Sequence, residues 1–302
     1  MSAVPGGTAC DPREPGVLRL GRHSFDVHQR LVMAIVNRTP DSFFDRGATW
    51  REDAAMERVH AVVADGAEII DIGGVPAAPG AEVDVAEEIR RTVPFVAAVR
   101  NAYPDVVISV DTWRHEVARE VCAAGADLLN DSWGGWDDKL AEVAAEYDVA
   151  LLCAHAGGLP PRTRPFRVTY DDVMADVLER TLGLARRAVA AGVDPSRILI
   201  DPAHDFGKNT WHSLEVTRRL DEMVATSWPV LVSLSNKDFV GETLDVPVGE
   251  RLTGTLAATA VCAWLGARVF RVHHVRETRQ TLDMVSAIRQ ECPPARTVRG
   301  LA

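Results

Sequence analysis

Residues 31–36 read LVMAIV, and the polar stretch NRTPDSFFDRG follows directly at 37–47. An uninterrupted apolar run of this length is typical of a strand that is buried on both faces of a parallel sheet. In α/β proteins, the loops that follow the carboxyl ends of such strands carry the catalytic and binding residues. The two stretches together predict a buried parallel strand that ends in a functional loop.

The same plan recurs along the rest of the chain, where short apolar runs alternate with longer segments of helical spacing. Strands are predicted at 31–36, 68–72, 106–110, 127–129, 149–153, 197–200, 230–234 and 268–272. Helices are predicted at 51–65, 85–100, 113–124, 138–146, 171–191, 210–226, 250–265 and 276–290. The pattern is therefore eight strands, each followed by a helix.

A glycine stands at four of the predicted helix ends, in the tripeptides DGA (65–67), AGA (124–126), AGV (191–193) and LGA (265–267). A left-handed cap costs least in a residue without Cβ, so each glycine predicts a helix end. These similar joints, with no linker-like stretch between them, favour one α/β domain, a (β/α)8 TIM barrel over residues 19–302. The alternative is an open doubly wound sheet, because strand order is not visible in a sequence. Residues 1–18 are predicted to be a disordered leader.

The composition of the chain narrows the class of protein. A net charge of −10 argues against nucleic acid or an anionic membrane as the partner, because binding to phosphates needs a basic face. The N-terminus lacks an apolar signal region, and no apolar run approaches the roughly 18 residues of a membrane span. The five cysteines are scattered and form no CxxC pair, as expected for reduced thiols. We therefore expect a cytoplasmic protein with a small-molecule ligand.

Polar side chains follow the predicted strands, where a barrel holds its chemistry. Any single one of them also suits a helix cap, but a cation at the inner end of a buried strand is costly unless it meets an anion. One group of these residues suits a flat heterocycle with several N–H donors: Asp111, Asn130, Asp201 and Lys237. A second group suits a phosphate or diphosphate, with an amide oxygen that can help to hold Mg²⁺: Arg271, His273 and Asn37.

Eight ordered motifs carry a family resemblance over residues 31–290: NRTPDSFFDRG, DIGG, SVDT, LNDSWGG, AHAGG, DPAHDFGKN, LSNKDFVGET and RVHHV. The chain resembles the dihydropteroate synthases, folate-pathway enzymes that join p-aminobenzoate to the diphosphate ester of a hydroxymethyl-dihydropterin. The resemblance implies a TIM barrel that is usually a homodimer. Methyl-folate-binding barrels have a similar kind of pterin pocket, but the TPDSF and DFGK stretches favour the synthases.

The resemblance also implies a role for each matching residue. Asp111, Asn130, Asp201 and Lys237 would hold the pterin. Arg271, His273 and Asn37 would hold the diphosphate, with Asn37 near Mg²⁺. The resemblance implies that Phe43 and Asp45 belong to a mobile first loop that closes over the reacting carbon, and that they are catalytic together with Lys237. Phe206 would line the wall near the incoming amine.

The chain departs from the family pattern on the side of the p-aminobenzoate. The usual Glu-Ser-Thr-Arg-Pro-Gly after DIGG is here VPAAPG at 75–80, so the arginine of this second loop has become Ala78. Ser-Arg-Lys-Ser is here SNKD at 235–238, which removes a second arginine and places Asp238 where a serine would meet the carboxylate of p-aminobenzoate. Asp-Pro-Gly-Ile-Gly-Phe-Gly-Lys is here DPAHDFGK, in which His204 and Asp205 add polar bulk.

These departures predict a synthase-like protein that binds 7,8-dihydropterin-6-ylmethyl diphosphate but condenses it weakly or not at all with p-aminobenzoate. Three alternatives stay open. They are an active synthase, a synthase that uses a different amine, and a non-catalytic pterin-binding or dimer-partner protein. The RTRP segment at 162–165 lies in a long loop after the fifth strand and suits either a lid or a partner contact.

Overall fold

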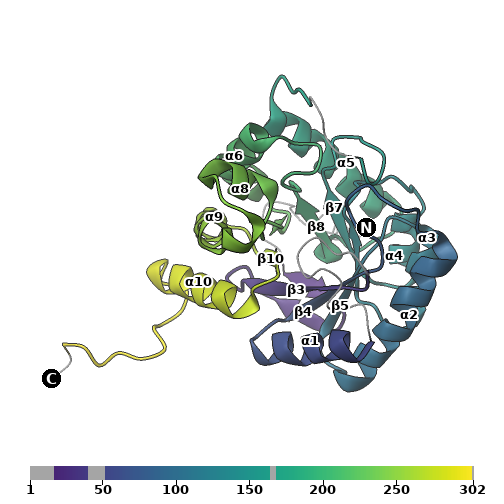
Figure 1. Cartoon of the computed structure of the whole chain (residues 1–302), viewed down its shortest axis with the longest axis horizontal. Coiled ribbons are helices and arrows are strands. Elements are labelled where there is room, and N and C mark those ends of the chain that lie inside the picture. Colours follow the sequence, from purple (N-terminus) through teal and green to yellow (C-terminus); the bar gives the residue numbers. More distant parts are fainter. Residues whose placement is uncertain (1–16, 40–51, 164–167, 301–302) are drawn as a thin grey trace, which may run out of the picture.

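The computed structural model describes residues 17–39, 52–163 and 168–300, and within them a ring of parallel strands is enclosed by helices (Figure 1). The strands pair in the order β8-β7-β6-β5-β4-β3-β10-β9, and a parallel bridge between Ile200 and Val230 joins the two ends. The predicted (β/α)8 barrel is therefore confirmed over the open doubly wound sheet. The strands of the ring are β3 (Leu31–Asn37), β4 (Ile69–Gly73), β5 (Val107–Asp111), β6 (Leu128–Asp131), β7 (Ala150–Ala154), β8 (Ile198–Asp201), β9 (Leu231–Val232) and β10 (Val269–Val272).

The helices cover the outer face of the ring. In the described residues they are α1 (Glu52–Ala64), α2 (Val85–Ala102), α3 (His115–Ala123), α4 (Leu140–Glu146), α5 (Val173–Ala190), α6 (Thr210–Arg218), α7 (Leu220–Val224), α8 (Asp238–Leu244), α9 (Leu252–Leu265) and α10 (Val275–Ile288). Two details differ from the sequence prediction. The helix predicted at 210–226 is divided at Arg219 into α6 and α7, and the short helix α8 in the loop after β9 was not predicted.

The four glycines predicted to end helices all have positive φ: Gly66 (95°), Gly125 (108°), Gly192 (103°) and Gly266 (112°). Gly266 shows the consequence most clearly, because it caps α9 and its N–H donates back to the carbonyls of Cys262 and Ala263. The chain then turns into β10 within three residues, which is the repeated joint that the sequence predicts.

Side chains of the strands alternate between two cores. Val32, Ala34 and Val36 of β3 face the helices, whereas Leu31 and Met33 face the barrel interior. A hairpin of β1 (Leu18–Leu20) and β2 (His23–Phe25) adds Leu18 and Leu20 to the interior core, so it closes the amino-terminal end of the barrel. Residues 1–16 of the predicted leader lie outside the described residues, and the ordered chain already includes Leu18. No helix in the described ranges has the length and apolarity needed to cross a membrane.

Candidate functional site

The interior of the barrel changes from apolar to polar along several of its strands. On β4, Ile69 belongs to the apolar interior core, while Asp71, two residues further on, is fully buried and polar. The strand register pairs Asp71 with Ser109 of β5, and Asp111 with Asn130 of β6. Because inward positions repeat every second residue, these polar side chains form one layer at the carboxyl end of the barrel.

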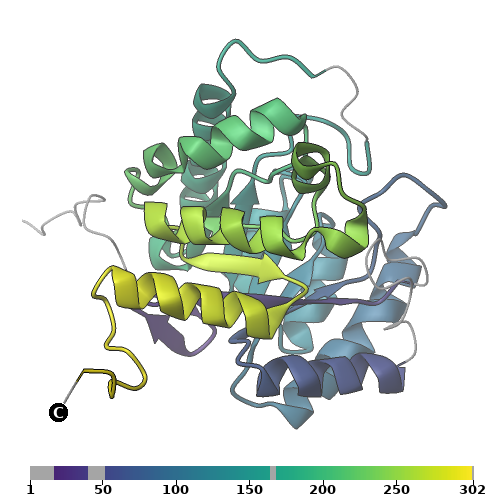
Figure 2. The same cartoon turned by 60° about the vertical axis from the view of Figure 1, so that its left-hand side comes forward.

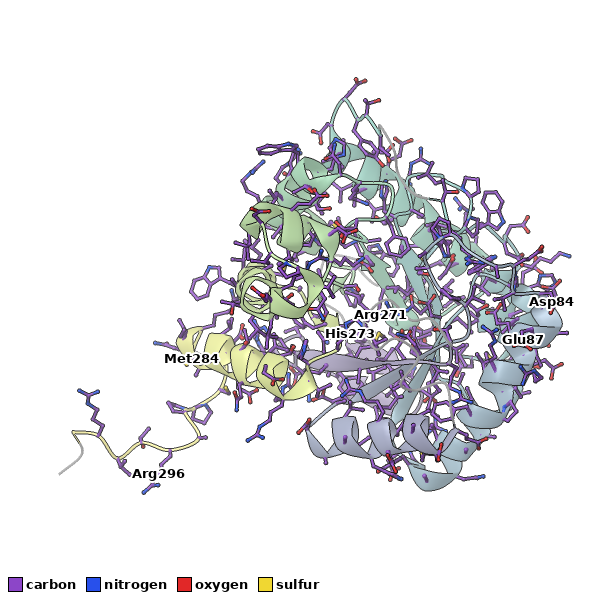
Figure 3. The ribbon with its side chains drawn as sticks, in the orientation of Figure 1. Asp84, Glu87, Arg271, His273, Met284 and Arg296 are labelled. Carbon is purple, nitrogen blue, oxygen red and sulfur yellow. The ribbon has the colours of Figure 1, made fainter. Side chains whose placement is uncertain are left out.

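Arg271 of β10 is the central cation of this layer. Its Nε donates to Asp71 Oδ2 at 2.6 Å, and its Nη2 donates to Asp111 Oδ2 at 2.9 Å. Figure 3 shows Arg271 and His273 in the middle of the ring. Burial raises the pKa of Asp111 to about 6, and the charge of Arg271 opposes that rise. Asp111 is thus a poorly hydrated carboxyl group, and an N–H donor of a ligand would stabilise its ionised form.

Asp71 organises the layer, although the sequence prediction gave it no role beyond its place at a strand end. It accepts the hydroxyl of Ser109 at 2.6 Å and the amide of Asn130 at 3.2 Å, in addition to the guanidinium of Arg271. Its motif, DIGG, carried the family resemblance, but only the register shows that three donors from three strands converge on one carboxylate.

Lys237, Asp201 and Phe206 form a second group beside the layer. The Nζ of Lys237 lies 4.5 Å from the centroid of the Phe206 ring and donates to the carbonyl of His204. Burial lowers the pKa of Lys237 and raises that of Asp201 to about 6. The Phe206 ring packs edge-on against Trp133, with centroids 5.0 Å apart. An aromatic wall therefore adjoins a cation and a carboxylate, as a flat polar heterocycle requires.

His273 and Asn37 lie at the ends of neighbouring strands. Burial, followed by the charge of Arg271, lowers the pKa of His273 to about 3, so its imidazole is neutral and offers hydrogen bonds but no charge. Nδ1 of its ring lies 3.1 Å from Ser235 Oγ. A Cβ on Gly73 would lie 3.4 Å from Asn37 Oδ1 and 4.0 Å from the Cβ of Asp111, so the amide oxygen of Asn37 lies beside the layer.

The structure thus brings together eight of the predicted site residues: Asp111, Asn130, Asp201, Lys237, Phe206, Arg271, His273 and Asn37. The two predicted catalytic residues of the first loop, Phe43 and Asp45, lie outside the described residues.

The loop after β4, which lacks the family's arginine at Ala78, receives a guanidinium from another loop. Arg162 donates through Nη2 to the carbonyl of Ala78 at 2.9 Å and through Nη1 to the carbonyl of Ala81 at 2.7 Å. The RTRP segment was expected to be either a lid or a partner contact. Its first residue, Arg162, contacts a loop of the same chain. The side chain of Arg162 thereby ties its own loop to the main chain of the loop after β4.

The loop that carries Phe206 has an unusual backbone. Ala203 and Asp205 have φ values of 49° and 68°, and both stand where the family pattern has glycine. The buried amine of Lys208 holds this loop through the carbonyl of Phe206 at 3.0 Å, and it also contacts Nδ1 of His155 at 2.6 Å. Burial lowers the pKa of Lys208 to about 7. The loop that carries Phe206 is therefore held by hydrogen bonds in spite of its strained residues.

The fold and this polar layer define a class of protein, the barrels with a polar ligand site at the carboxyl ends of their strands. A model of the family described as pterin binding enzyme matches residues 33–273, and the chain belongs to this family.

Within the family, its relatives are dihydropteroate synthases. The chain is 60% identical over 278 residues to "Inactive dihydropteroate synthase 2" of Mycobacterium leprae (strain TN), covering 91% of this chain and 96% of the relative. It is 38% identical over 265 residues to the dihydropteroate synthase of Escherichia coli (strain K12), covering 87% and 93%. A crystal structure of the Yersinia pestis dihydropteroate synthase with a sulfonamide drug complex matches with a TM-score of 0.86 and 34% identity, covering 92% of this chain and all of that one. The predicted divergent paralogue of the synthase family is confirmed.

Proposed function

We propose that the barrel mouth binds 7,8-dihydropterin-6-ylmethyl diphosphate and that condensation with p-aminobenzoate is weak or lost. The observation that carries the binding proposal is the convergence of Arg271, Asp71 and Asp111 at the end of the barrel. Asp111, Asn130, Asp201 and Lys237 suit the pterin edge, since ionised buried carboxylates accept N–H bonds strongly. Arg271 and the neutral His273 suit the diphosphate as donors.

Mg²⁺ fits the same end of the barrel. The amide oxygen of Asn37 beside Gly73 offers one ligand, and diphosphate oxygens and water would complete the shell in the way Mg²⁺ prefers. Bound there, the ion would offset the charge that develops on the departing diphosphate. The residues of this chain would orient the ester for departure, with Arg271 donating to its oxygens and the Phe206 wall limiting access of water.

The proposed loss of condensation has two supports. A relative with 60% identity carries the name of an inactive synthase, and the second loop lacks a side-chain cation at Ala78. The guanidinium of Arg162 does not restore it, because it is engaged with main-chain carbonyls of that loop. The first-loop residues Phe43 and Asp45 retain the family's residue types, which favours the alternative of an active synthase. An assay with p-aminobenzoate distinguishes the two.

Isothermal titration with the pterin diphosphate and Mg²⁺ tests the binding proposal. We expect measurable binding by the wild type, weakened roughly tenfold or more in Asp111→Ala and Lys237→Ala, because each loses a charge-assisted hydrogen bond. Unchanged affinity in both variants would overturn the proposed binding mode. Product formation with p-aminobenzoate at a rate typical of an active synthase would overturn the loss of condensation.

We also propose a homodimer formed through α9 and α10, which lie side by side on one flank of the barrel (Figure 2). The α9 sequence LTGTLAATAVCAWL contains no charged residue, and its outward Val261 and Trp264 are 47% and 51% exposed. Met284 and Ile288 of α10 are exposed as well, and Figure 3 shows Met284 on the outer side. An apolar face of this kind on adjacent helices is typical of a protein interface, and a second copy would cover it isologously.

Analytical ultracentrifugation of Trp264→Glu tests the dimer. We expect the wild type to sediment as a dimer and Trp264→Glu as a monomer. Trp211→Glu is the matched control, because Trp211 is 79% exposed on α6, and it should remain dimeric. A monomeric wild type would refute the proposal.

The acidic net charge supports a small-molecule ligand over nucleic acid or membrane, and the buried free thiols of Cys122, Cys153 and Cys262 support a cytoplasmic location.

A further inference from the structure

Asp205 joins the two loops that bound the Phe206 side of the pocket. Its Oδ2 accepts the main-chain N–H of Asp238 at 2.6 Å and that of Phe239 at 3.3 Å. The same two loops are joined a second time by Lys237, whose Nζ donates to the carbonyl of His204 and lies over the Phe206 ring. A carboxylate of the protein itself therefore occupies N–H donors next to the aromatic wall.

The backbone of Asp205 indicates that this contact is specifically supported. Its φ of 68° lies in the left-handed region, which is unfavourable for most residues with a Cβ. Hydrogen bonds compensate for this strain, because its N–H donates to Ser213 Oγ at 3.1 Å and Ser213 Oγ donates to its Oδ1 at 3.2 Å. Ser213 is fully buried on α6, so it anchors the carboxylate toward Asp238.

Asp238, the carboxylate that the sequence singled out, is directed differently. Its Oδ1 accepts Arg251 Nη1 at 2.9 Å, and its side chain is 68% exposed. Arg251 also donates to the carbonyl of Asn236 at 2.8 Å. The carboxylate of Asp238 is thus paired and solvated, whereas the carboxylate of Asp205 is largely withdrawn from water next to Lys237, where burial raises its pKa and the charge of Lys237 opposes that rise.

We infer that Asp205 is a specificity-determining residue that excludes ligands with an acid group from the Phe206 side of the pocket and admits neutral amines of the same shape. Two physical effects act together. The N–H groups of Asp238 and Phe239 already hold the Asp205 carboxylate, so they are not available to the acid group of a ligand, and that acid group would meet the charge of Asp205 at short range. This inference deepens the proposed function, since it rests on the amine entering beside Phe206.

The test compares an acid with its neutral isostere. Binding of 4-aminobenzoate and of 4-aminobenzamide is measured by titration, with and without saturating pterin diphosphate, and the ratio of their affinities is the readout. We expect the wild type to prefer the amide at least tenfold. Asp205→Asn removes the charge but keeps an oxygen, and Asp205→Gly removes both and relieves the positive φ. We expect the ratio to shift toward the acid at least tenfold in Asp205→Asn and further in Asp205→Gly.

Asp238→Asn is the matched control, which removes a carboxylate from the adjacent loop and should leave the ratio within about threefold of the wild type, because that charge is paired and exposed. A ratio unchanged in both Asp205 variants, or shifted equally by Asp238→Asn, would overturn the inference. A wild type that prefers the acid would also overturn it. Failure to bind the pterin diphosphate would instead refute the proposed function. The two outcomes are distinguishable, since the ratio of affinities measured without the pterin diphosphate still reports on Asp205.

Discussion

The prediction with the largest expected effect concerns Asp71, the buried carboxylate on which three strands converge. Asp71→Asn keeps the size of the side chain and an oxygen for Ser109, but it leaves the guanidinium of Arg271 without one of its two anions. Breaking a buried ion pair from one side costs about 3–5 kcal/mol. Arg271 keeps Asp111 and is 18% exposed, so we expect a loss of about 2–4 kcal/mol in the free energy of unfolding.

The assay is urea unfolding of Asp71→Asn, Arg271→Met and the double variant, analysed as a thermodynamic cycle. We expect the double variant to be less destabilised than the sum of the single variants by about 1–3 kcal/mol, because the charges of Asp71 and Arg271 are removed together. Asp111 loses its cation equally in Arg271→Met and in the double variant, so this loss does not change the comparison. Glu146→Gln is the control, since it removes a carboxylate from the exposed pair with Arg119 and should leave the midpoint unchanged. A loss below about 1 kcal/mol in Asp71→Asn, or additive effects, would refute the account of Asp71 as the organising anion.

Three further predictions follow from buried or bridging groups. The pKa of Lys208 is lowered to about 7, so between pH 7 and about 10 the unfolded chain holds a proton that the native state lacks. The free energy of unfolding of the wild type, relative to that of Lys208→Met, should therefore rise with pH in that window. Chemical unfolding at several pH values tests this, and a difference that stays constant with pH would contradict it. The pKa of Asp131 is raised to about 7 by burial, so stability relative to Asp131→Asn should fall as pH rises from about 4 to 7. Arg162→Ala should speed amide exchange in residues 78–81 with no change in the unfolding midpoint, and unchanged exchange there would contradict the bridging role of Arg162.

The strands of the barrel were predictable because burial on both faces leaves a continuous apolar run. Each of the eight begins at the predicted residue or one residue after it. The residue before the strand is in several cases a charged one on the amino-terminal rim, such as Asp127, which pairs with Arg100, or Glu68, which pairs with Arg279. The β1–β2 hairpin escaped prediction because its strands alternate in burial and form no continuous apolar run. The helix α8 escaped prediction because Gly241 interrupts the helical pattern of its seven residues.

The two sides of the candidate site differ in how far they could be predicted, and the reason is geometric. Arg271, Asp111 and Asn130 are inward residues of strands, so their convergence follows from a period of two and a parallel register once the strands are known. The Phe206 side is built from loops, where a change of φ at one residue redirects every later side chain. Asp205 was recognised only as added polar bulk, since nothing in DPAHDFGK reveals a left-handed residue whose carboxylate turns to the N–H of Asp238. Replacing a glycine in such a loop therefore has two effects on the site. It adds a side chain, and it requires further contacts to hold a strained backbone. The specificity inferred for Asp205 therefore lies in the segment where sequence patterns are least informative.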